Sequence, residues 1–293
     1  MIVVRLKGGL GNQLFQYASA LSLAMNTKLP LRMDVSFYKE QTLREYKLRE
    51  LNIDYSEKII DPELPVTIKV IRNRYVNKTL RKLGLRHIMC SQNYISCLDE
   101  MPSLEFINPC KNYYLDGYYQ SEKYFSDQRE NLLHQLTPKY DAEPEYEQIL
   151  QSIRNCNSVA VHARRGDFAT QKDRTVGKQH YLLGERYYQN TLNYMADQVS
   201  CPEFFWFFDD IDWVKENFGN MPNFHFIHLN TNHPDIDELM LMKNCKHIIT
   251  ANSTFSWWAA WLNENENAIK VCPARRYGNV DMIPDGWVKI AVE

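Results

Sequence analysis

Short apolar runs alternate along the chain with segments in which apolar residues recur every three or four positions. In the second half, the runs predict strands at residues 158–163, 204–208, 224–229, 247–250 and 269–271. The periodic segments there predict helices at residues 143–154, 185–199, 213–217, 235–244 and 254–262. The first half predicts strands at residues 2–6, 29–33 and 113–116, and helices at residues 14–25 and 121–136. Such alternation is typical of parallel sheets with helices on both faces.

The organisation that follows is an α/β fold with two Rossmann-like domains that face each other across a cleft. Pro138 and Pro144 punctuate the chain between the halves, and we predict domains at residues 1–150 and 151–293. The last residues are free in this prediction to pack back on the first domain. Residues 37–110 mix charge runs with scattered prolines and predict no clear order of elements. Because ligands bind at the carboxyl ends of parallel strands, the chemistry is expected directly after the strands.

A glycine-rich turn, Gly8-Gly9-Leu10-Gly11-Asn12-Gln13, separates the first strand from the first helix. Glycine lets the backbone approach a ligand closely, and a helix N-terminus favours an anion. Gly9, Gly11 and the later Asp34 match part of the dinucleotide-binding fingerprint, but Leu14 stands where its third glycine belongs. The turn therefore fits either a ligand contact or a tight turn without a ligand.

Two arginines follow the strand at residues 158–163, in the run His162-Ala163-Arg164-Arg165-Gly166-Asp167. The planar guanidinium suits a pair of phosphate oxygens and is charged at any working pH. In an extended segment His162 and Arg164 share one face while Arg165 points to the other. We therefore expect one arginine to face the cleft and the other to pair with a carboxylate such as Asp167. The alternatives are a loop held by Arg–Asp pairs alone and a purely structural histidine.

Two further strand ends carry polar residues. Asp209 and Asp210 follow a run of five aromatic residues, and Asp210 is open to two interpretations, a ligand contact or the cap of the next helix. A metal site would need further ligands nearby, and the sequence offers none, so no metal is expected. Ser253 or Thr254 is a natural N-cap, and hydroxyls beside the free amides of a helix start can hold an anion.

Composition narrows the class of protein. The 34 basic and 36 acidic residues give a net charge of −2, which excludes whole-chain electrostatic capture of nucleic acid. No apolar run approaches the ~20 residues that cross a bilayer. The first residues lack the features of a signal peptide, and seven cysteines without a Cys-x-x-Cys pair favour a reducing compartment, so we expect a cytoplasmic protein. The basic stretch at residues 69–86 is expected to be a solvated helix face or, alternatively, a peripheral contact with an anionic membrane.

Five segments together resemble the glycosyltransferase family 11 α-1,2-fucosyltransferases. They lie at residues 9–18, 115–125, 162–167, 209–210 and 253–258, and they occur in the family's order. The resemblance implies a GT-B architecture, GDP-β-L-fucose as donor, a galactose-terminated glycan as acceptor, and inversion to an α-1,2 linkage. It also implies that no metal or other cofactor is required.

The resemblance further implies roles for individual residues. The residues expected to bind the donor are Gly9, Gly11, Asn12, His162, Arg164, Arg165, Asp210, Ser253, Thr254 and Phe255, of which the last three line the seat of the pyrophosphate. Arg164 is expected to contact the β-phosphate with Arg165 in support, and Asp210 to read the guanine edge. Arg164, Asn12 and Asp167 form the expected catalytic group, with Asn12 facing the fucose and the acceptor.

Three points stay open at this stage. The proton acceptor is unassigned among Asp34, Asp116 and Asp167, each of which is more often structural. The glycine turn alone also fits a nicotinamide- or flavin-dependent oxidoreductase, although that function leaves the paired arginines unexplained. A non-catalytic nucleotide-sugar-binding protein would carry the same donor site, and only turnover separates it from a transferase.

Overall fold

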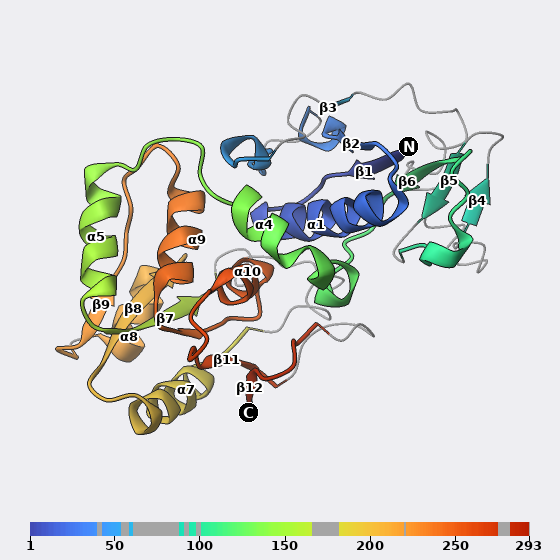
Figure 1. Ribbon diagram of the computed structural model, residues 1–293. Coiled ribbons are helices and arrows are strands. Elements are labelled where there is room, and N and C mark those ends of the chain that lie inside the picture. The colour runs from blue at the N-terminus through green and yellow to red at the C-terminus, as the bar shows by residue number, and fades with distance from the viewer. Residues whose placement is uncertain are drawn as a thin grey trace. The chain divides into compact units, whose positions relative to one another are not determined.

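The computed structural model describes residues 1–39, 43–53, 59–60, 88–90, 94–97, 101–165, 182–219, 221–274 and 282–292. The chain divides into two compact units, Met1–Lys139 and Tyr140–Glu293 (Figure 1). The division falls in the stretch marked by Pro138 and Pro144, one helix before the predicted boundary at residues 150/151. Helix α5 (Pro144–Arg154) belongs to the second unit because its buried side packs on α9 (Pro234–Asn244) and on β7 (Asn157–Ala163).

The first unit is built on a sheet in the order β3-β2-β1-β6-β5-β4. Its strands are β1 (Ile2–Arg5), β2 (Leu31–Asp34), β3 (Ile59–Ile60), β4 (Ile88–Cys90), β5 (Tyr94–Cys97) and β6 (Asn112–Leu115). Neighbouring strands are parallel except β4 and β5. The sequence did not predict β3, β4 and β5, which lie in the region without a clear pattern. From β1 the chain adds β2 and β3 on one side, whereas β6, β5 and β4 lie on the other side of β1. The strand order therefore reverses between β1 and β6, which are neighbours.

Helix α1 (Leu10–Thr27) covers this sheet, and most of its residues are buried. The other helices of the first unit are α4 (Arg129–Gln135) and the short 3₁₀ helices η1 (Ser36–Lys39), η2 (Leu48–Glu50), η4 (Leu104–Phe106), η5 (Glu122–Tyr124) and η6 (Ser126–Gln128). In place of the single helix predicted over residues 121–136, the structure has three shorter helices, η5, η6 and α4. Its chain departs from helical geometry at Phe125, which is fully buried with its ring centroid 5.9 Å from that of Phe15.

The second unit carries an all-parallel sheet in the order β12-β11-β10-β7-β8-β9. Its remaining strands are β8 (Pro202–Phe208), β9 (Phe224–Phe226), β10 (His247–Ile249), β11 (Lys270–Pro273) and β12 (Val288–Ile290), and its remaining helices are α7 (Glu185–Gln198), α8 (Ile211–Phe218) and α10 (Thr254–Leu262). Counted from β7, this is the strand order of dinucleotide-binding domains, and it reverses between β7 and β10. Strand β12, which the sequence did not predict, pairs with β11 and so belongs to the sheet of this unit.

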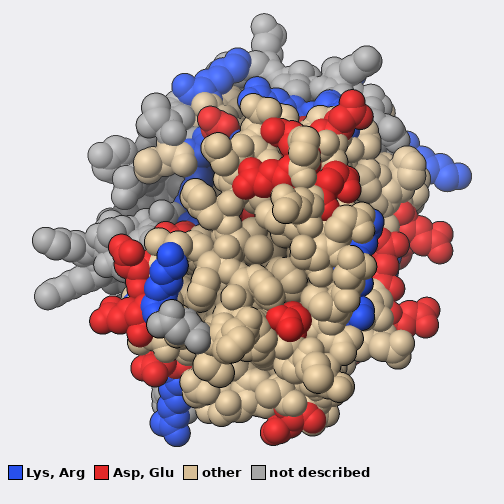
Figure 2. All heavy atoms as spheres, turned by 90° about the vertical axis from the view of Figure 1, so that its left-hand side faces the viewer, with Lys and Arg blue, Asp and Glu red and all other residues tan. Residues whose placement is uncertain are grey.

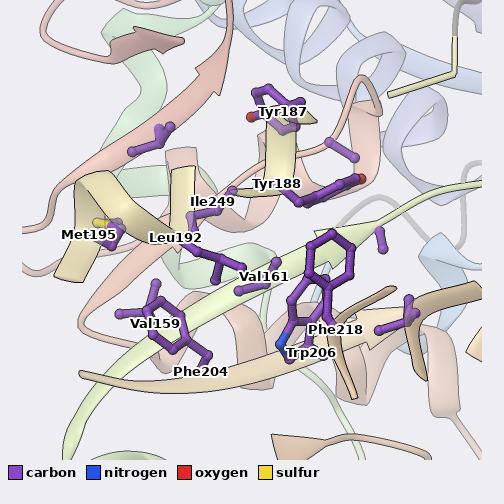
Figure 3. Close-up of a cluster of buried hydrophobic side chains, with 14 of the residues drawn as sticks. Val159, Val161, Tyr187, Tyr188, Leu192, Met195, Phe204, Trp206, Phe218 and Ile249 are labelled. Carbon is purple, nitrogen blue, oxygen red and sulfur yellow. The ribbon is translucent and has the colours of Figure 1, made fainter. Parts of the chain in front are cut away.

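Aromatic side chains dominate the core of the second unit. Figure 3 shows Val159 and Val161 of β7 lying among Tyr188, Phe204 and Trp206, which come from α7 and β8. The Trp206 ring stacks on Phe218 of α8 with a centroid distance of 5.0 Å. Burial of each such side chain stabilises the fold by roughly 1.5–3 kcal/mol. The core therefore fixes α7 and α8 against the strands whose ends carry the polar residues.

The described residues on the face drawn in Figure 2 do not gather into a basic patch. On the face drawn in Figure 2, the Lys and Arg residues are scattered towards the edges of the view and separated by acidic and uncharged residues. No helix among the described residues is long and apolar enough to span a membrane. The basic stretch at residues 69–86 lies outside the described residues.

Candidate active site

The carboxyl ends of β7 and β10 meet at the point where the strand order of the second sheet reverses. Two adjacent tyrosines of α7 hold these strand ends. The Tyr188 hydroxyl donates to the carbonyl of His162 at 3.2 Å, and the Tyr187 hydroxyl donates to that of Thr250 at 2.7 Å. Sequence reasoning missed both tyrosines, since their spacing indicates only the buried side of a helix. They fix the two loops that carry the candidate donor residues.

One carboxylate fixes the first arginine and the backbone of the second. The Oδ2 atom of Asp209 lies 2.9 Å from Nη1 of Arg164, and its Oδ1 atom accepts the backbone N–H of Arg165 at 2.7 Å. About a quarter of the Arg164 side chain is nevertheless exposed, at 26%. The guanidinium is therefore oriented by the protein while part of it can still reach a ligand.

The second arginine is braced inside the unit, as the opposite direction of its side chain predicts. Nη1 of Arg165 donates to the carbonyl of Leu183 at 3.2 Å, and its guanidinium carbon lies 3.9 Å from the ring centroid of Trp213. Its Nε atom lies 3.9 Å from Oδ2 of Asp210. The predicted partner, Asp167, lies outside the described residues, so Asp209 and Asp210 are the carboxylates that the structure places beside the arginine pair.

Asp210 caps the next helix, which is one of the two interpretations that the sequence left open. Its Oδ1 atom accepts the backbone N–H of Trp213 at 3.1 Å at the start of α8. The cap is stabilising because it satisfies an amide that has no partner within the helix. A contact of Asp210 with the guanine edge stays a prediction.

The residues after β10 build the start of α10 as predicted. Ser253 is the N-cap, and its hydroxyl accepts the backbone N–H of Phe255 at 3.2 Å. Thr254 is the first residue of the helix, and the buried hydroxyl of Ser256 accepts the N–H of Ala251 at 3.1 Å. These bonds hold the loop so that the first turn of α10 opens beside the end of β7.

His162 joins the two strand ends as a neutral, buried side chain. Its ring centroid lies 5.7 Å from that of Phe255. Burial, reinforced by the positive charge of Arg164, lowers the pKa of His162 to about 3. The imidazole is therefore uncharged at neutral pH and can act only as a hydrogen-bonding group or an apolar surface. Its predicted contact with the donor stays a prediction.

Glu238 of α9 is a candidate site residue that sequence reasoning missed. Burial and the nearby Asp235 raise its pKa to about 7, while Arg164 acts in the opposite direction. Arg164 and Asp209 are thus close enough to Glu238 for their charges to affect it. In the sequence, Glu238 is one of several acids at the start of a helix, where acids are common because they complement the helix dipole.

We expect Glu238→Gln to change the pH dependence of stability. The folded protein keeps the Glu238 proton up to about pH 7, whereas the unfolded chain loses it near pH 4.5, so wild-type stability falls as the pH rises between these values. The variant should match the wild type at pH 4 and exceed its free energy of unfolding by about 3 kcal/mol at pH 8, since the pKa differs by about 2.5 units between the two states. Urea unfolding at both pH values measures this, with the exposed Glu266→Gln as control. If the free energies of unfolding of variant and wild type differ by the same amount at pH 4 and at pH 8, the raised pKa of Glu238 is contradicted.

The predicted residues of the first unit gather at the end of β1. Gly8 has φ +83°, and a Cβ atom there would lie 2.8 Å from Nδ2 of Asn12. Gly9 is the N-cap of α1 with open space around its Cα, whereas Gly11 is buried in the first turn. The side chain of Asn12 is oriented by Gln120, whose Nε2 donates to its Oδ1 at 2.8 Å. Only glycine fits at residue 8 next to this amide.

The structure gives two of the candidate proton acceptors a structural role. Asp34 is fully buried and accepts the Tyr114 hydroxyl at 2.7 Å and the backbone N–H of Ser36 at 2.9 Å. Asp116 lies 2.6 Å from Lys7 Nζ and 3.1 Å from Arg5 Nη1. Burial favours its neutral form, but the two cations outweigh burial and hold the pKa of Asp116 below its ordinary value. Both carboxylates therefore stabilise the end of the first sheet.

The chain is similar to known glycosyltransferases over nearly its whole length. The chain is 34% identical over 99% of its length to an α-1,2-colitosyltransferase from Escherichia coli, of which 99% is covered. It is 29% identical over 97% of its length to the O-antigen biosynthesis glycosyltransferase WbnK from Escherichia coli, again with 99% covered.

A crystal structure of the fucosyltransferase NodZ from Bradyrhizobium is 13% identical with a TM-score of 0.51, covering 88% of this chain and 90% of that chain. This likeness confirms the predicted GT-B-like α/β fold class. The model of glycosyl transferase family 11 matches residues 1–282. The protein therefore belongs to glycosyltransferase family 11.

Proposed function

We propose that this glycosyltransferase moves L-fucose from GDP-β-L-fucose to the 2-hydroxyl of a terminal galactoside, with inversion to an α-1,2 linkage, in the synthesis of a surface glycan or oligosaccharide. The observation that carries the proposal is the oriented, partly exposed Arg164 side chain at the strand-order reversal of the second sheet. Family membership decides against the oxidoreductase hypothesis that the glycine turn alone allowed.

The chemistry of the transfer explains why this arrangement suits it. Breaking the bond between fucose and GDP builds positive charge on the sugar carbon and negative charge on the departing phosphate. A fixed guanidinium and the free amides of a helix start stabilise that negative charge without needing to reorganise. Arg164 supplies the first, and the start of α10 at Ser253 and Thr254 supplies the second. We therefore propose that transfer needs no metal ion.

A second donor is favoured by a specific observation. The relative with 34% identity over nearly the whole chain is named for colitose rather than fucose. Colitose lacks the 3-hydroxyl of L-fucose, so a site that hydrogen-bonds this hydroxyl should discriminate strongly between the two sugars. GDP-colitose is therefore the competing donor to be offered beside GDP-fucose.

The test is GDP release by the purified full chain in the presence of EDTA. GDP-fucose is supplied with lactose or with cellobiose, which lacks a terminal galactose, and the product linkage is read by NMR. Lactose-dependent release with an α-1,2-fucosylated product is the expected result. Loss of activity in EDTA with recovery on adding Mg²⁺ or Mn²⁺ would overturn metal independence. If the enzyme transfers sugar from GDP-colitose but not from GDP-fucose, colitose replaces fucose as the proposed donor sugar. If the protein binds GDP but transfers sugar to no galactoside, the proposed acceptor is wrong.

A further inference from the structure

An exposed tyrosine stands at the strand-order reversal of the first sheet, the equivalent of the place where the donor residues lie in the second. Lys7 follows β1 and Tyr118 follows β6, and these strands are neighbours. Tyr118 is 44% exposed although it lies in the segment 115–125, which the donor chemistry does not use. Because ligands of parallel sheets bind at such reversals, this ring occupies a position suited to ligand contact.

The backbone next to Tyr118 is held in a conformation that is costly for its residue type. Tyr119 has φ +49°, in the left-handed region that bulky residues rarely adopt. Its side chain is buried, and its hydroxyl donates to the carbonyl of Cys97 at 2.9 Å. Such strain persists where the surroundings enforce it, and it concentrates at ligand-contacting segments. On either side of this residue, Tyr118 is exposed and Gln120 bonds to Asn12.

The ring of Tyr118 also contacts a cation that the first unit holds in place. The Nζ atom of Lys7 lies 4.9 Å from its ring centroid, and Asp116 in turn holds that ammonium at 2.6 Å. The Tyr38 phenol is close enough for Tyr118 to contribute to raising its pKa, after burial. Tyr38 itself donates to the carbonyl of Gly8 at 3.0 Å. The aromatic surface is therefore tied to the same loop that carries Asn12.

We propose that Tyr118 is the stacking platform for the terminal galactose of the acceptor, an inference that rests on the proposed function. Galactose presents a patch of C–H groups on one face of its ring, and an aromatic face is the side chain surface that such a patch fits. The loop tied to this ring carries the amide of Asn12 and accepts the Tyr38 hydroxyl at Gly8, and we assign these polar groups to the sugar hydroxyls. An aromatic ring with a few polar groups beside it is typical of small-ligand sites.

The experiment compares Tyr118→Ala with Tyr118→Phe and with Met25→Ala in the full chain. Met25 is a matched control because it is 47% exposed in the last turns of α1, far along the helix from Asn12. Tyr118→Ala should raise the KM for lactose about tenfold. The KM for GDP-fucose and the unfolding temperature should stay unchanged. Tyr118→Phe, which keeps the ring, and Met25→Ala should both behave as the wild type.

A binding measurement separates this proposal from the proposed function. Saturation-transfer NMR with methyl β-galactoside should show contact in the wild type and in Tyr118→Phe, and loss of contact in Tyr118→Ala. If the wild type transfers fucose to lactose but Tyr118→Ala keeps the wild-type acceptor KM, the platform is overturned and the function stands. If the galactoside signal depends on Tyr118 but no fucose is transferred, the function fails and the platform stands. A rise in both KM values together with a lower unfolding temperature would show a structural role and overturn the platform.

Discussion

Arg164→Ala is expected to lower kcat about 10²–10³-fold, the usual effect of removing one preorganised group that stabilises charge in a transition state. The guanidinium is held by Asp209 at 2.9 Å, so its orientation is set before the donor binds. Stabilisation of the leaving phosphate then costs no rearrangement at the moment of reaction. The effect should therefore fall mainly on kcat, while the KM for the donor changes less.

Two further variants, Arg164→Lys and Arg186→Ala, test whether the loss of activity is specific to the guanidinium of Arg164. Lysine keeps the charge but not the planar fork, so Arg164→Lys should recover little of the activity. Arg186 lies exposed on α7, and its removal should leave kcat unchanged. Steady-state rates of GDP release with lactose measure all three variants. Near-normal turnover in Arg164→Ala would refute the role of this arginine in transfer.

The sequence identifies the strand ends that carry the candidate site because the pattern at each strand end is local. A strand of apolar residues that runs into Arg164 and Arg165, and another that runs into Ser253, place polar groups at the ends of parallel strands wherever the strands themselves lie. In the structure these strands, β7 and β10, are neighbours. The alternation of strands and helices predicts a parallel sheet, but it does not say which strands are neighbours.

What the sequence could not predict depends on contacts between distant segments. The bonds from Tyr187 and Tyr188 to the strand ends span 63 and 26 residues, and nothing in the helix pattern distinguishes them from ordinary core tyrosines. The raised pKa of Glu238 could not be predicted for the same reason, because it arises from burial and from charges that include those on other elements. The short strands of the first unit could not be predicted for another reason. Strand β3 has two residues and β4 has three, which are too few to show any periodicity.

Trp206→Ala is expected to lower the free energy of unfolding by about 3–5 kcal/mol, the range for truncating a large buried aromatic residue. The indole stacks on Phe218 at 5.0 Å and lies 5.9 Å from the ring of Tyr188, centroid to centroid (Figure 3). The cavity left by alanine would lie directly beneath the tyrosine that holds the His162 carbonyl. The Trp206→Ala variant should therefore lose both stability and the correct position of the loop after β7, which carries Arg164.

Trp206→Phe is the matched variant, because it keeps a ring against Phe218 and removes an indole N–H that has no partner among the described residues. It should cost no more than about 1–2 kcal/mol, less than the alanine variant by the difference in cavity size. Urea unfolding followed by circular dichroism measures both, and GDP release measured well below the unfolding temperature tests the coupling. If Trp206→Ala loses stability but keeps the full wild-type rate at low temperature, the core stabilises the unit without positioning the donor loop. If the rate falls in the alanine variant and is kept in the phenylalanine variant, packing beneath Tyr188 is what holds the end of β7 in place for Arg164.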